Sequence, residues 1–327
     1  MTDKSSPIPS RRHSTWSRVV KHRNYYFMII PALLIIIVFS YLPMTGLLLA
    51  FKDYRFKTPS LFGDIPILRF LGQILNMEWV GFHWFKRLLS MPDFHRALVN
   101  TIRISVCRLI IEFPMPVILA LIMNEVRVTR VKRIYQTIYT FPHFLSWVLV
   151  MSIMQQLLNV NGTFNHIRVA MGQNPYPYLL ESSTIQTVVH TTSIWKGVGW
   201  GSIIYMATIS GIDPTLYEAA VVDGANRWHR IIYITLPSIK PIILIMFILA
   251  CGSILNAGFD QIINIYRDTT RHRLDIFDTF IYRFAFQARN QNFSLTIAAG
   301  MFKSVFNFIF LLAANKITKL VGEEGLI

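Results

Sequence analysis

The sequence is poor in charged residues and in cysteine. Only 15% of its 327 residues are charged, with 17 acidic residues against 32 lysines and arginines, whereas 53% are hydrophobic. This composition excludes an ordinary soluble domain. The two cysteines, Cys107 and Cys251, have no histidine or cysteine partners at ligand spacing. The sequence therefore predicts neither a disulfide nor a metal site, and we expect both cysteines to be packing residues.

Motifs for nucleotide binding and for covalent catalysis are also missing. There is no G-x-x-x-x-G-K-S/T phosphate loop, no H-E-x-x-H pair, no nucleophile elbow and no glycine-rich dinucleotide pattern. We predict no catalytic residue and no cofactor bound by this chain. The net charge of +15 would suit nucleic acid in a soluble protein, but basic loops at a membrane surface explain it better, so we expect a lipid bilayer and no nucleic acid.

The sequence does contain long apolar segments. A ~30 Å hydrocarbon core requires about 20 apolar residues per helix. Six segments meet this length: Tyr25 to Leu49, Ala97 to Ile122, Ile134 to Leu158, Thr184 to Ile209, Pro241 to Phe259 and Leu295 to Ala314. We predict an all-α, multi-pass membrane protein with six transmembrane helices.

The distribution of basic residues predicts the orientation of these spans. Six lysines and arginines lie within residues 1–24, and four more lie within the 127–133 loop. Short basic loops stay in the cytoplasm, so both termini are predicted to be cytoplasmic. The chain then divides into a basic tail over 1–24, a membrane domain over 25–315 and a tail over 316–327.

A polar stretch broken by one glycine separates the fourth and fifth spans. Asp213 suits an N-cap and is followed by proline, so a short helix is predicted from 214 to about 223, where Gly224 ends it. A second short helix is expected to stop before Pro237. The two helices form an elbow over 213–237, which the span count places in the cytoplasm.

The elbow resembles the EAA signature of the membrane subunits of binding-protein-dependent ABC importers. The pattern is E-A-A, three residues, glycine, nine residues and I-x-L-P, and the matching residues are Glu218, Ala219, Ala220, Gly224, Ile234, Leu236 and Pro237. The resemblance implies that these residues, together with Arg227, couple the chain to an ATPase subunit.

Other segments, over 81–101, 141–147, 193–200 and 258–283, are similar to the sugar-importer branch that handles complex oligosaccharides, including alginate. The resemblance implies a type I importer permease fold in the inner membrane. It also implies a second homologous permease subunit, two ABC ATPase subunits that bind ATP and magnesium, and an extracytoplasmic solute-binding protein that delivers the oligosaccharide.

Cations and aromatic rings inside the spans are candidates for a substrate pathway. Aromatic rings can stack on pyranose C–H faces, and a cation can meet a uronate carboxylate. The candidates are Arg103, Arg108, Trp147, Trp195, Lys196, Trp200, Asn256 and Asp260. The structural alternatives are an ion pair between Arg108 and Glu112, four residues apart, and interfacial or snorkelling roles for the tryptophans and Lys196.

Other functions stay open at this point. The same machine could carry a neutral oligosaccharide or a different solute. A self-contained secondary carrier is a further alternative, weakened because the sequence has no internal repeat and no paired broken helices. A membrane anchor or scaffold without transport activity would belong to a different class.

Overall fold

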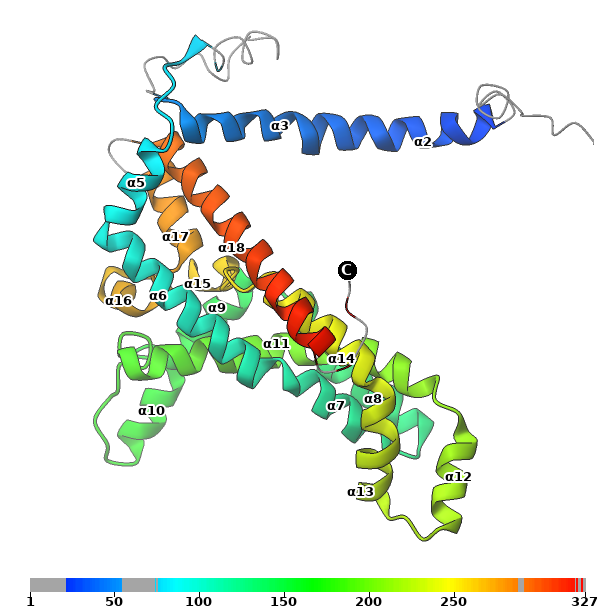
Figure 1. Cartoon of the computed structure of the whole chain (residues 1–327). Coiled ribbons are helices and arrows are strands. Elements are labelled where there is room, and N and C mark those ends of the chain that lie inside the picture. The colour runs from blue at the N-terminus through cyan, green and yellow to red at the C-terminus, as the bar shows by residue number, and fades with distance from the viewer. Residues whose placement is uncertain are drawn as a thin grey trace, which may run out of the picture.

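The computed structural model describes residues 22–54, 74, 76–287, 291–320, 322 and 325. Its regular structure there is helical, apart from one isolated bridge between Lys52 and Trp79. The helices form an oblique bundle with the 213–237 elbow at one end and the 268–287 segments toward the other (Figure 1). We call these the elbow end and the distal end. The predicted tail over 1–24 lies outside the described residues except for 22–24.

The first predicted span is a continuous helix over residues 23–51. It comprises α2 (Arg23–Ile36), a π turn (Ile37–Tyr41), α3 (Leu42–Met44) and a 3-10 segment (Thr45–Phe51). Figure 1 shows this helix extending away from the bundle, and its 3-10 segment packs against α18 (Phe293–Leu320). Its most apolar window contains no buried residue. An apolar surface of this length requires lipid or another subunit to cover it.

The second predicted span lies within one 33-residue helix over 92–124. It comprises α6 (Pro92–Cys107), a π turn (Arg108–Glu112) and α7 (Pro114–Asn124). In the π turn the Phe113 N–H donates to the Arg108 carbonyl at 2.9 Å. A wide turn just before a proline accommodates its ring and its missing N–H without ending the helix.

The third predicted span is broken. Residues 129–144, comprising α8 (Thr129–Thr140) and a 3-10 turn (Phe141–Phe144), lie at 94° to residues 147–170, comprising α9 (Trp147–Leu158) and α10 (Thr163–Ala170). Pro142 interrupts the hydrogen-bond ladder, and the Ser146 hydroxyl then accepts from the Leu149 N–H at 3.3 Å to start α9.

The fourth predicted span forms α11 (Ser182–Ser210), which packs along α7, α8 and α14 (Leu236–Cys251). Among the described residues, four helices are long and apolar enough to cross a membrane, or five if the bent pair is one span. Although 29 residues long, α11 is not one of these four, because many of its residues are polar. By length and apolarity alone, the described helices therefore provide fewer membrane spans than the six predicted.

The fifth predicted span starts earlier and ends earlier than expected. The helix runs over 227–251, through α13 (Arg227–Arg230), a π turn (Ile231–Thr235) and α14. The prediction that the second elbow helix stops before Pro237 is wrong. The π turn directly precedes this proline, as another does at Pro114, so the helix continues.

Short elements connect α14 to the last helix. They are α15 (Phe259–Ile262), a 3-10 turn (Asp268–Thr270), α16 (Arg271–Leu274), α17 (Phe277–Tyr282) and a π turn (Arg283–Gln287). The sixth predicted span lies within α18, which continues to Leu320. At the distal end, Phe94, Phe277 and Phe280 are fully buried in a cluster that also includes Leu88 of α5 (His83–Ser90).

Candidate functional site

The first helix of the elbow forms as the sequence predicts. α12 (Pro214–Val222) starts at Asp213, whose carboxylate accepts from the Thr215 N–H at 2.9 Å. This hydrogen bond holds the pKa of Asp213 below its usual range. Gly224 has a φ of +78°, and the Ala225 N–H donates to the Ala220 carbonyl at 2.8 Å, which closes the end of the helix.

The second arm of the elbow is continuous with a membrane helix. The Asn226 side chain accepts from the His229 N–H at 2.9 Å and starts α13, and Arg227 Nε lies 3.9 Å from Glu125 Oε2 at the end of α7. The hydroxyls of Tyr217 and Thr235 are 2.9 Å apart and join the two arms. Movement of the elbow would therefore be passed directly to α14.

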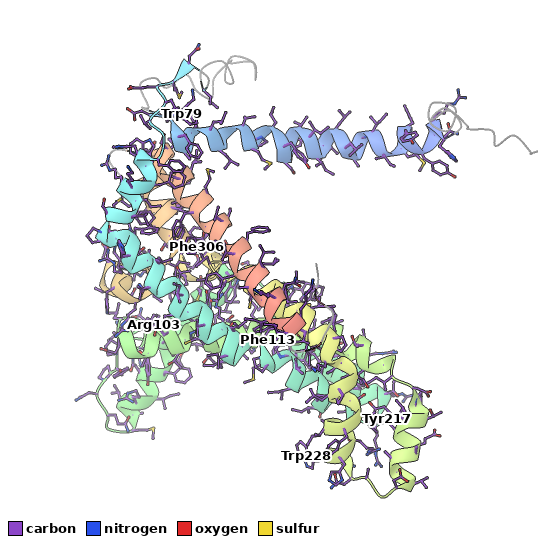
Figure 2. All side chains as sticks on the ribbon, viewed as in Figure 1. Trp79, Arg103, Phe113, Tyr217, Trp228 and Phe306 are labelled. Atoms are coloured by element: carbon purple, nitrogen blue, oxygen red, sulfur yellow. The ribbon has the colours of Figure 1, made fainter. Side chains whose placement is uncertain are left out.

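The outer surface of the elbow combines exposed apolar side chains with exposed charged ones, among them Glu218. Val222 is 87% exposed and Trp228 is 71% exposed, and Figure 2 shows Trp228 near the tip of the elbow. Glu218 and Ala219 are exposed on α12, while Ala220 is half-buried. In the I-x-L-P segment, Ile234 is half-buried, and Leu236 and Pro237 are exposed. This surface has the composition of a protein contact.

A second polar site lies inside the helix bundle, around the π turn of the second helix. Arg108 Nε lies 3.5 Å from Glu112 Oε1, so the predicted ion pair is confirmed. Glu112 also accepts from His190 Nδ1 at 2.7 Å, with this nitrogen protonated, and from the Ser193 hydroxyl at 2.5 Å. Arg108 donates through Nη2 to Gln261 Oε1 at 2.6 Å.

A cavity of about 300 Å³ adjoins this cluster. Its polar lining residues are Ser105, Arg108, Glu112, Ser193, Ser253 and Asn256. A second cavity, of about 320 Å³ and mainly apolar, shares Pro116 and Ala250 with it and is also lined by Tyr205 and Met246. The two cavities adjoin, and their lining from the second helix, α11 and α14 changes from polar in one to apolar in the other.

Three of the predicted pathway residues gather at the break in the third span. Lys196 is buried and donates to the His143 carbonyl, and its Nζ lies 5.4 Å from the centre of the Trp147 ring. Trp200 stacks on the His143 ring with centroids 4.6 Å apart. Trp195 is 45% exposed on α11. The Lys196 ammonium therefore has a structural partner in the His143 carbonyl at the break.

The remaining predicted pathway residues do not meet. Arg103 is exposed on α6, as Figure 2 shows, and Asp260 is exposed on α15. Neither is among the described residues that line the cavity. Of the eight candidates, only Arg108 and Asn256 lie at the cavity.

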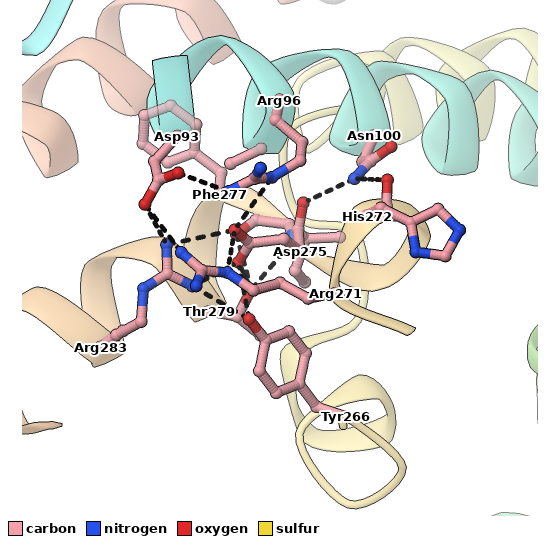
Figure 3. Close-up of polar contacts among 12 residues, drawn as sticks. Asp93, Arg96, Asn100, Tyr266, Arg271, His272, Asp275, Phe277, Thr279 and Arg283 are labelled. Carbon is pink, nitrogen blue, oxygen red and sulfur yellow. Dashed lines mark hydrogen bonds and ion pairs between the residues drawn. The ribbon is translucent and has the colours of Figure 1, made fainter. Parts of the chain in front are cut away.

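Sequence reasoning missed a buried ionic network at the distal end (Figure 3). The Asp275 side chain is fully buried and accepts from Arg283 at 2.9 and 3.1 Å, and Arg271 Nε lies 3.6 Å away. Asp93 accepts from Arg271 at 2.7 Å and also pairs with Arg96. The network joins α6 to the α16–α17 segment.

The chain matches a known family of transport proteins. Residues 112–322 match the family described as binding-protein-dependent transport system inner membrane component. The chain belongs to this family. It is thus a multi-pass subunit of an inner-membrane transport system that works with a binding protein, and it is a transport subunit rather than an enzyme.

Individual members of the family resemble the chain along nearly its whole length. The polygalacturonan/rhamnogalacturonan transport system permease protein YteP of Bacillus subtilis is 37% identical over 94% of this chain and 92% of its own. Protein LplB of the same organism is 38% identical over 95% of this chain and 94% of its own. A chain in the crystal structure of a bacterial alginate ABC transporter, in complex with an alginate pentasaccharide-bound periplasmic protein, superimposes with a TM-score of 0.83 at 33% identity. That match covers 95% of this chain and 99% of the other, so the permease has the type I importer fold.

Proposed function

We propose that this chain is one of two homologous permease subunits of an ATP-driven importer for acidic oligosaccharides. The observation that carries the proposal is the chemistry shared by two relatives that match over more than nine tenths of the chain. Polygalacturonan and alginate are both chains of uronates, with one carboxylate on each sugar. The basic net charge and the arginine at the cavity support a pathway for such anions.

Energy for import comes from two ATPase subunits that bind ATP and magnesium and receive the cytoplasmic elbow. The helix over 227–251 starts in the elbow at Arg227, and its residue Ala250 lines both cavities. A push on the elbow would therefore move a wall of the pathway. ATP-driven approach of the ATPases would rock the spans between inward-facing and outward-facing states, and the loaded binding protein would bias the same equilibrium.

Within this pathway, Arg108 and Asn256 are the residues that we propose to meet the sugar. Lys196, Trp147 and Trp200 hold the broken third span beside it. The first helix, whose most apolar window contains no buried residue, would pack against the second permease subunit and lipid.

The test is co-purification from gently solubilised membranes, followed by an ATPase assay. An ATPase, a homologous permease and a binding protein should be recovered with the chain. Oligogalacturonates or oligoalginates should then stimulate hydrolysis more strongly than neutral oligosaccharides of equal length. Stimulation by the neutral sugars alone would reassign the substrate, and recovery of the chain alone would contradict the importer.

A further inference from the structure

The guanidinium of Arg108 has donors that its protein neighbours leave unused. It carries five N–H groups. In the described part of the chain, Nη2 donates to Gln261, whereas Nε is buried and has no hydrogen-bond partner. The nearest carboxylate, that of Glu112, is 3.5 Å from Nε. The Arg108 side chain nevertheless lines the cavity and is 21% exposed, so guanidinium N–H groups that the described residues leave unused can bind an acceptor from outside the chain.

Glu112 does not depend on Arg108 for its hydrogen bonds. His190 binds one carboxylate oxygen at 2.7 Å and Ser193 binds the other at 2.5 Å, and both come from α11. The carboxylate therefore stays in place when Arg108 pairs with another anion. It remains close enough to act as the counter-ion of Arg108 when the cavity is empty.

The guanidinium is also held in a fixed plane. Gly258 has a φ of +83°, and a Cβ there would lie 2.6 Å from Nη1, so only glycine lets the backbone pass this close. Gln261, which accepts from Arg108, donates through its amide nitrogen to the Val189 carbonyl at 2.6 Å and to the Thr192 hydroxyl at 2.8 Å. Such a preorganised arginine suits a carboxylate, which it can bind through two parallel hydrogen bonds.

We propose that Arg108 binds a carboxylate of the transported sugar and that this carboxylate replaces Glu112 as its counter-ion. The site takes one uronate at a time, and Glu112 restores the ion pair when the sugar leaves. Exchange of one carboxylate for another keeps the arginine paired throughout, which matters because an unpaired charge inside a membrane protein is unfavourable. The inference rests on the proposed importer function and deepens it.

The test compares uptake of a trimeric oligogalacturonate or oligoalginate with uptake of its carboxyl-reduced form, by the whole complex in proteoliposomes. Arg108→Gln should lower uptake of the acidic sugar about tenfold to hundredfold, the range that corresponds to hydrogen bonds to charged groups. Uptake of the reduced sugar should change little. Glu112→Gln should lower the KM for the acidic sugar, because the competing carboxylate is gone.

The charge-balanced double variant, Arg108→Gln with Glu112→Gln, covers the case in which the single arginine variant fails to assemble. It should lose the preference for the acidic sugar. Arg168→Gln, which removes a cation on α10 outside the cavity, should keep that preference. An unchanged acid preference in the double variant, or equal losses for both sugars in Arg108→Gln, would overturn the carboxylate site. Failure of the wild-type complex to carry either sugar would instead contradict the proposed function.

Discussion

Replacing Gly224 by valine tests whether the turn of the elbow couples the chain to its ATPases. Gly224 has a φ of +78°, and a Cβ there would meet nothing within 4 Å. The cost is therefore confined to the backbone, about 1–2 kcal/mol for a left-handed conformation. That cost lowers the equilibrium ratio of closed to open turn by a factor of about 5–30. Since the spans pack independently of this turn, the protein should insert normally.

The measurement is ATP hydrolysis stimulated by the loaded binding protein, in reconstituted complexes with equal amounts of the chain. We expect Gly224→Val to lose most of the stimulation. Gly224→Asn should retain much of it, because asparagine tolerates this conformation. The matched control is Gly172→Val, since Gly172 has a φ of +76° and equally open surroundings but lies in the loop after α10.

Two results would refute this reasoning. Wild-type stimulation in Gly224→Val would show that the turn has no part in coupling. An equal loss in Gly172→Val would show that left-handed strain anywhere in the chain has the same effect, so that the elbow has no special role.

Asp275→Asn should lower the melting temperature of the detergent-solubilised complex, because it leaves Arg283 with a weaker partner. Loss of one partner from a buried ion pair costs roughly 3–5 kcal/mol. An unchanged melting temperature would contradict this prediction. A single cysteine at Asn226 should react with a membrane-impermeant reagent only after the cells are opened, since the elbow is predicted to be cytoplasmic, and labelling in intact cells would reverse the topology. The lowered pKa of Asp213 predicts that its cap stabilises α12 above the usual aspartate pKa and that this contribution is lost as the pH falls through the lower folded-state pKa. Hydrogen exchange of the Thr215 amide should then rise, relative to its intrinsic rate, as the carboxylate is protonated, and the rise should be much smaller in Asp213→Asn.

The sequence by itself determined the features that depend on residues within one or two helical turns. The Asp213 cap, the end of the first elbow helix at Gly224 and the ion pair from Arg108 to Glu112 are of this kind. Long apolar runs likewise predicted α18 and the first two long helices. Local sequence was less reliable at prolines, because whether a helix bends at Pro142 or continues through Pro237 depends on the turn that precedes each one.

Only the tertiary structure decided which polar residues meet. Arg108 and Gln261 are 153 residues apart, and Asp93 and Arg271 are 178 apart, yet both pairs are hydrogen-bonded. The packing of α11 against the second helix placed His190 and Ser193 on Glu112, and the same packing left Arg103 outside the cavity. The physical reason is that a buried charge must find a partner, and which partner lies within reach is set by helix packing rather than by spacing along the chain.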